Sequence, residues 1–120
     1  MSNGKEIKVG MIGLGGIASG AHLPALSKIE GVKFVGMCDT VEDRVKSISQ
    51  KYGGNPYTDY RKMLDKEELD CVYICVPPFA HGKIEMDCIK RKLPMFIEKP
   101  VAVNKETAEK IKAEIEKNKI

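Results

Sequence analysis

The sequence predicts an α/β fold in which helices cover both faces of a doubly wound parallel sheet. Strand-like apolar segments alternate five times with segments of helical periodicity along the 120 residues, as in sheets built from strand–helix–strand units. The most distinctive residues also come directly after the predicted strands. We therefore expect about five strands in the order 3-2-1-4-5, joined by right-handed crossovers within three layers of helix, sheet and helix.

The first unit consists of a strand over residues 8–12, a glycine-rich turn and a helix. Residues 13–18 read Gly-Leu-Gly-Gly-Ile-Ala, a G-x-G-x-x-A string. Gly13 permits the tight turn and Gly15 lets a ligand approach the backbone, so the string predicts that a pyrophosphate binds where the helix starts. We expect that helix to reach residue 29 with an interruption near Pro24, because proline suits the first turn of a helix better than its middle.

The remaining units follow in the same order along the chain. The expected strands cover residues 32–38, 55–58, 71–76 and 95–97, and the expected helices cover residues 41–52, 59–64, 80–92 and the segment after residue 104. Thr40 is placed to cap the second helix. Pro56 lacks an N–H, which predicts that the third strand lies at an edge of the sheet.

Four distinctive features converge on one edge of this sheet. The glycine string ends the first strand, Asp39 the second, Pro77 and Pro78 the fourth, and the string Glu-Lys-Pro at residues 98–100 the fifth. The carboxyl ends of parallel strands meet at one edge, and doubly wound folds bind ligands there, at the point where the strand order reverses. The sequence thus predicts a binding crevice outside the first and fourth strands.

Asp39 and Arg44 bear on the identity of the ligand. Asp39 follows Ala18 by 21 residues, the spacing at which dinucleotide-binding folds carry the acidic residue that binds the adenosine ribose. A carboxylate there repels a 2′-phosphate, which favours NAD over NADP. Arg44 opposes this preference, because an arginine nearby accommodates the same phosphate.

Three further side chains are candidates for contacts with a cofactor or substrate. Lys99, at a strand end, is placed to hydrogen-bond a substrate hydroxyl or to move its proton if burial lowers the pKa of its ammonium group; an exposed loop lysine is the alternative. His81 either touches the ligand or is an ordinary residue at a helix start. For His22, a surface or packing role is favoured over contact with the crevice.

The composition excludes several other classes of protein. The 20 basic and 17 acidic residues are interleaved, so we expect no nucleic-acid or membrane partner. No apolar run has the length of a membrane span and no signal peptide is evident, which favours the cytoplasm. The four cysteines form no C-x-x-C, so we expect small buried side chains and no metal site.

Together these segments resemble the Gfo/Idh/MocA family of nicotinamide-dependent oxidoreductases, which includes glucose–fructose oxidoreductase and inositol dehydrogenase. The matching segments are the glycine string, residues 22–26, Cys38-Asp39, residues 76–81 and residues 98–100. The resemblance implies a Rossmann domain that binds NAD or NADP for hydride transfer to or from a sugar, cyclitol or related polyol. It also implies that Lys99 is catalytic. The residues then expected to bind the cofactor are Gly13, Leu14, Gly15, Gly16, Ile17, Asp39, Thr40, Arg44, Val76, Pro77, Pro78, His81, Glu98, Lys99 and Pro100.

The resemblance also sets an expectation for the domain organisation. Members of the family are longer and carry a second α/β domain, which supplies most of the substrate pocket and the oligomer interface. We expect residues 1–120 to be the NAD(P)-binding domain of a longer, homo-oligomeric enzyme and to show no useful turnover alone. Two alternatives stay open: a non-catalytic NAD(P)-sensing regulatory module of the same fold, and a domain for another adenosyl ligand such as S-adenosylmethionine.

Overall fold

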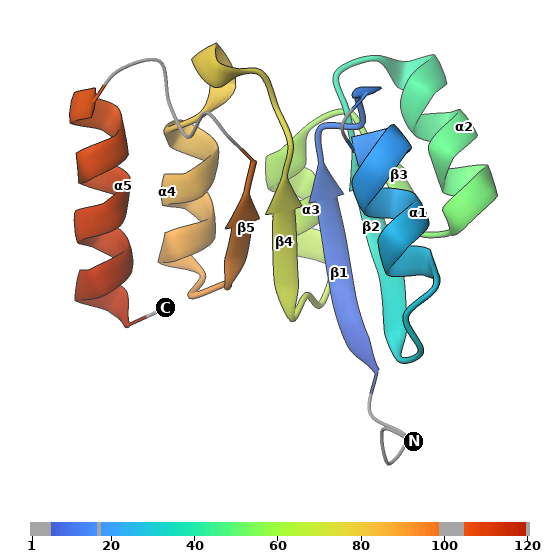
Figure 1. Ribbon diagram of the computed structural model, residues 1–120, viewed down its shortest axis with the longest axis horizontal. Coiled ribbons are helices and arrows are strands. Elements are labelled where there is room, and N and C mark those ends of the chain that lie inside the picture. The colour runs from blue at the N-terminus through green and yellow to red at the C-terminus, as the bar shows by residue number, and fades with distance from the viewer. Residues whose placement is uncertain (1–5, 17, 99–104, 120) are drawn as a thin grey trace.

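The computed structural model describes residues 6–16, 18–98 and 105–119, and in them the chain forms a parallel five-stranded sheet in the order β3-β2-β1-β4-β5 (Figure 1). The strands are β1 (Ile7–Ile12), β2 (Val32–Cys38), β3 (Asn55–Tyr57), β4 (Cys71–Ile74) and β5 (Met95–Ile97). The predicted fold class and strand order are confirmed. β3, which contains Pro56, forms an edge as expected.

Helices lie on both faces of the sheet (Figure 1). They are the π-helix η1 (Ala18–His22), α1 (Leu23–Ser27), α2 (Glu42–Tyr52), α3 (Tyr60–Lys66), the 3₁₀ turn η2 (Pro78–Ala80), α4 (Lys83–Lys90) and α5 (Lys105–Asn118). Pro24 stands in the first turn of α1, so the interruption of the first helix falls where it was expected.

The core has two halves, one on each face of the sheet. In β1, Val9 and Met11 pack with α1 and α2, whereas Ile12 packs on the opposite face with α3 and α4. Successive side chains of a strand point to opposite faces, so a strand covered on both sides is apolar along its length. The two half-cores confirm the three-layer arrangement.

The ends of several elements differ from the predictions. Thr40 does not cap α2; Val41 precedes that helix, and its N–H donates to Oδ1 of Asp39 at 2.8 Å. β4 ends at Ile74 and α4 begins only at Lys83. α4 therefore starts three residues later than residue 80, where it was predicted to start. The reason is the backbone of Gly82, whose φ of +114° and ψ of −75° are far from helical values.

The four cysteines are buried or half-buried. Burial raises the pKa of the Cys38 and Cys88 thiols to about 12, so both stay protonated at neutral pH and behave as small apolar groups. No described helix is long and apolar enough to cross a membrane.

Candidate functional site

The strands end in register, which brings the residues that follow them to one place. Ile12 lies opposite both Cys38 and Ile74, and Ile74 lies opposite Ile97. The segments that begin at Gly13, Asp39, Cys75 and Glu98 therefore leave the sheet side by side. A cavity of about 770 Å³ lies among them, and we call it the strand-end cavity.

Ten of the predicted binding residues line the strand-end cavity. They are Gly13, Leu14, Gly15, Gly16, Asp39, Thr40, Arg44, Val76, Pro77 and Glu98. Pro78 belongs to η2, but its side chain is outside the described part of the structure. Ile17, Lys99 and Pro100 also lie outside the described residues, so their roles remain predictions.

Glycine is required at Gly13 by the fold, whereas at Gly15 and Gly16 it leaves space for a ligand. At Gly13, φ is +91°, and a Cβ would lie 2.6 Å from the carbonyl oxygen of Cys75. The fold itself therefore requires glycine there. At Gly15 and Gly16, in contrast, a Cβ would meet nothing within 4 Å. Open space above this backbone is what close approach of a pyrophosphate requires, so the turn fits a dinucleotide.

The helical segment that follows begins directly at the cavity. The N–H of Ser19 donates to the carbonyl oxygen of Gly15, and the Ser19 hydroxyl donates to the carbonyl oxygen of Leu14, both at 2.9 Å. These bonds join the glycine turn to η1. The amino end of a helical segment carries partial positive charge, which suits a phosphate group at this position.

Asp39 is held in place by three donors. Its Oδ2 accepts the N–H of Leu14 at 2.8 Å, its Oδ1 accepts the N–H of Val41 at 2.8 Å, and Nη1 of Arg44 lies 3.3 Å from Oδ2. The residue is 7% exposed. Two carboxylate oxygens offer about four acceptor positions, so capacity for a ribose hydroxyl remains. The Arg44 guanidinium partly compensates the negative charge that would repel a phosphate.

At the β5 end of the cavity, Glu98 pairs with His22, for which the sequence favoured a surface or packing role over contact with the crevice. His22, the last residue of η1, places Nε2 2.5 Å from Oε2 of Glu98. Both side chains are about one-fifth exposed. The His22 ring also packs edge-on against Tyr73 and Phe96, at centroid distances of 5.6 and 5.1 Å. The two partners are separated by 76 residues in the sequence, so no local sequence pattern could predict that they pair.

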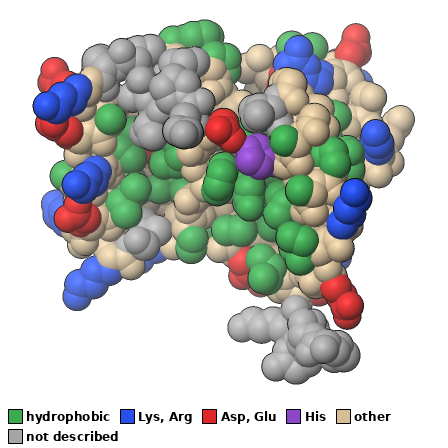
Figure 2. All heavy atoms as spheres, in the orientation of Figure 1, with side chains coloured by type: hydrophobic (Ala, Val, Ile, Leu, Met, Phe, Trp, Pro, Cys, Tyr) green, Lys and Arg blue, Asp and Glu red, His purple; other side chains and the backbone are tan. Residues whose placement is uncertain are grey.

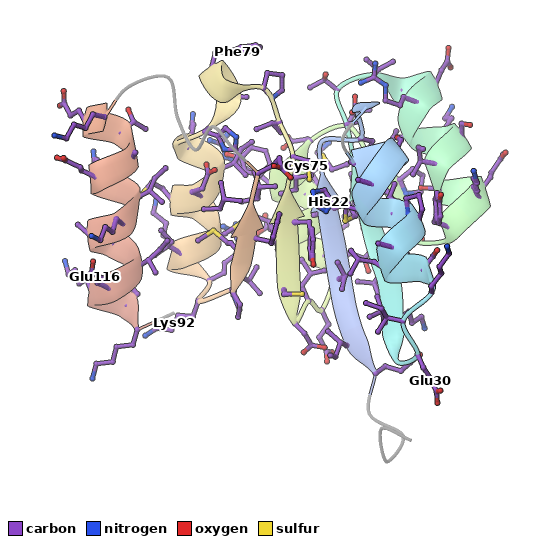
Figure 3. All side chains as sticks on the ribbon, in the orientation of Figure 1. His22, Glu30, Cys75, Phe79, Lys92 and Glu116 are labelled. Carbon is purple, nitrogen blue, oxygen red and sulfur yellow. The ribbon has the colours of Figure 1, made fainter. Side chains whose placement is uncertain are left out.

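The turn after β3 also reaches the strand-end cavity. Thr58, Asp59 and Tyr60 line it, although none was predicted to do so. The sequence could have predicted them, because they follow the third predicted strand and therefore lie at the same edge of the sheet as the other strand ends. Phe79, in the turn after β4, is 79% exposed and lies at the outer end of that turn (Figure 3).

His81 lies apart from these residues. Its side chain is fully buried, and Nδ1 bonds to the carboxylate of Glu85. His81 borders a second cavity of about 510 Å³, which Arg61 of α3, Lys90 of α4 and Lys110 of α5 also line. The structure therefore does not bring His81 together with the other predicted binding residues, because its ring, just before α4, pairs with Glu85 in the first turn of that helix.

Comparison with known proteins assigns this arrangement to a family. The Gfo/Idh/MocA oxidoreductase family, described by its NAD-binding Rossmann fold, matches residues 7–120. A myo-inositol 2-dehydrogenase from Thermotoga maritima is 29% identical over 99 residues, which are 82% of this chain and 29% of that protein. A dTDP-3,4-didehydro-2,6-dideoxy-α-D-glucose 3-reductase from Actinomadura kijaniata is 28% identical over 110 residues, which are 92% of this chain and 33% of that protein.

A solved structure agrees with these matches. A 3-ketoreductase from Actinomadura kijaniata, crystallised with NADP and TDP-benzene, superposes with a TM-score of 0.86 at 26% identity. The match covers 95% of this chain and 35% of that one. The chain thus spans about a third of the length of these relatives. With its strand order, glycine turn and strand-end cavity, the chain belongs to the Gfo/Idh/MocA oxidoreductase family and carries that family's NAD-binding Rossmann fold.

Proposed function

We propose that this chain binds NAD or NADP as the cofactor domain of an oxidoreductase that acts on a sugar, cyclitol or related polyol. The observation that carries the proposal is the strand-end cavity, in which the open glycine turn, Asp39 and Glu98 follow three different strands. The names of the relatives support the substrate class, since one is an inositol dehydrogenase and another reduces a nucleotide-linked sugar. We place this chemistry in the cytoplasm, where cysteines stay reduced.

Different residues of the cavity bind different parts of the cofactor. The backbone at Gly15 and Gly16 leaves room for the pyrophosphate, and Asp39 accepts hydrogen bonds from the adenosine ribose. When bound, the nicotinamide accepts or supplies the hydride. Lys99, which the family resemblance assigns as catalytic, exchanges a proton with the substrate oxygen. The residues that select the substrate, and those that join copies of the protein, are proposed to lie outside these 120 residues.

We further propose that NAD is preferred to NADP by a modest factor. Asp39 cannot turn away from a 2′-phosphate, because two main-chain N–H groups hold it. Arg44 is half-exposed and bonded to Asp39 through a single long contact of 3.3 Å, so it can turn toward the phosphate. The two residues act in opposite directions, and NADP remains a usable cofactor.

Calorimetric titration with NADH and NADPH tests the proposal directly. Gly15→Val places a branched side chain where the pyrophosphate approaches, and NADH affinity is expected to fall about 100-fold, equal to about 2.8 kcal/mol. Stability should stay within about 0.5 kcal/mol, because a Cβ at this position would meet nothing within 4 Å. Gly20→Val is the matched control, since its Cβ also meets nothing within 4 Å and the residue does not line the cavity. Unchanged NADH affinity in folded Gly15→Val would contradict the proposed site.

A further inference from the structure

The second cavity lies among three helices and is lined mostly by positive charge. Four cationic side chains line it: Arg61 of α3, Lys83 and Lys90 of α4, and Lys110 of α5. α4 and α5 lie side by side (Figure 1). Among the described residues of the lining, Asp87 is the one acid. The volume of about 510 Å³ is typical of sites for small molecules, and the charge suits an anion.

These cations have donors to offer a ligand. The three lysines form no ion pair with another described residue. Nε of Arg61 lies 3.1 Å from Oδ2 of Asp87, which also accepts the Tyr60 hydroxyl, and the guanidinium carries further N–H donors. α5 as a whole carries four lysines and four glutamates, and Figure 2 shows side chains of both signs along it, at the left edge. The excess of cations is therefore a property of the cavity and not of the helix.

One residue of the lining, His81, has a buried ring nitrogen that lacks a partner. The side chain is fully buried, and Nδ1 bonds to the carboxylate of Glu85. Nε2 is buried as well and has no hydrogen-bond partner among the described residues. An unpaired polar atom in the interior costs free energy, and such atoms are rare enough in native proteins to indicate a bound water, ion or ligand. Because His81 borders the second cavity, a molecule bound there is placed to supply the partner.

The bond at Nδ1 narrows the choice of anion. Nδ1 must carry a hydrogen to bond an ionised carboxylate, so Nε2 is an acceptor in the neutral ring and a donor in the charged ring. An ionised carboxylate ligand could only accept a hydrogen bond. A phosphate group accepts through its oxygens and, when singly protonated, also donates through a hydroxyl. It therefore fits Nε2 of His81 in both states of the ring, and its charge fits the four cations.

We propose that the second cavity binds a small phosphate-bearing molecule, whose phosphate is held by the four cations and supplies the partner that Nε2 of His81 lacks. The site is distinct from the proposed cofactor site, because the second cavity and the strand-end cavity share no described lining residue. The inference therefore does not depend on the proposed function, and either can fail while the other stands.

Nuclear magnetic resonance with inorganic phosphate tests the proposal on the whole chain. Phosphate is added at constant pH and constant ionic strength, and the ring nitrogens of the two histidines are followed in long-range ¹H–¹⁵N spectra. The Nε2 signal of His81 should shift and saturate with a dissociation constant of about 1 mM. The ring of His22, which is outside the lining of the second cavity, should not shift. The amide signals of Gly15 and Gly16 report separately on phosphate at the glycine turn.

Two double variants with the same change in net charge test the cations. Lys90→Gln with Lys110→Gln should weaken phosphate binding about tenfold, equal to about 1.4 kcal/mol. Lys112→Gln with Lys117→Gln is the matched control, because these lysines of α5 are also exposed but do not line the cavity, and it should bind as the unmodified chain does. Equal weakening in the two variants would overturn the inference.

The ring signals of the unmodified chain decide the remaining outcomes. A shift of the His81 ring that does not saturate, or shifts confined to Gly15 and Gly16, would overturn the inference, because phosphate would then bind elsewhere or not at all. If the variant at Lys90 and Lys110 does not fold, these signals decide alone: saturation at His81 without change at His22 supports the site, and its absence overturns it.

Discussion

The β2 end and the β5 end of the strand-end cavity hold their carboxylates by different means. At the β2 end, Asp39 accepts hydrogen bonds from the main-chain N–H groups of Leu14 and Val41. At the β5 end, Glu98 bonds to the side chain of His22, and both are about one-fifth exposed. The first carboxylate is held by main-chain donors, and the second bonds to a side chain that lies 76 residues away along the sequence.

This difference separates a rigid half of the site from an adjustable one. Main-chain donors do not titrate and persist whenever β1 and α2 are formed, so the position of Asp39 follows from the fold. The Glu98 contact is made by a side chain, so any substitution of His22 changes it. A cofactor would thus meet a carboxylate fixed by the fold at one end and a carboxylate held through a side-chain contact at the other.

Removing the two carboxylates one at a time should lower the free energy of unfolding by different amounts. Asp39→Ala leaves the N–H groups of Leu14 and Val41 without this acceptor in a buried setting and is expected to cost about 3 kcal/mol. Glu98→Ala breaks a partly exposed pair and is expected to cost about 1 kcal/mol or less. Urea unfolding followed by circular dichroism measures both. Equal losses at the two positions would show that the ends are not built differently.

The conservative variant Asp39→Asn serves as the control for that measurement. An amide oxygen can still accept one of the two main-chain N–H groups, so the loss should be smaller than in Asp39→Ala. If Asp39→Asn is as unstable as Asp39→Ala, the charge rather than the hydrogen bonds holds the β2 end together.

Arg44→Ala should change cofactor selectivity with little effect on stability. The guanidinium is half-exposed, so its contribution to folding is expected to be within about 1 kcal/mol. Loss of its charge at the cavity should weaken NADPH binding about tenfold and leave NADH binding within about twofold. Competition titrations with the two reduced cofactors measure this. Equal weakening of both would mean that Arg44 supports Asp39 rather than contacting a 2′-phosphate.

The smallest expected effect concerns the thiol beside the β5 end. Burial, and then the charge of Glu98, raise the pKa of Cys75 to about 11. Glu98→Gln removes the second cause, so the thiolate fraction near pH 9 should rise a few-fold, and alkylation should quicken by a similar factor. Peptide mass spectrometry after timed iodoacetamide treatment resolves Cys75 from Cys38, whose rate should not change. Acceleration of both thiols would indicate general loosening of the core.

Sequence reasoning located the strands well because an apolar run of strand length is a local property. It was wrong about the cap of α2 and about the start of α4, which begins at Lys83. Thr40 had the right type and place for a cap, yet Asp39 takes the N–H of Val41 instead. Asp39 is available because its carboxylate is already fixed by Leu14, a residue of another strand's turn.

By itself the sequence determined the strand order and the edge at which Gly15, Asp39 and Glu98 gather, because strand ends and crossover rules follow from local pattern. Only the tertiary structure decided how the two histidines are used. His22 reaches Glu98 across 76 residues, and His81 turns to Glu85 and away from the strand-end cavity. Both outcomes depend on how η1 and α4 pack against the sheet, and that packing places each ring beside one carboxylate and not another.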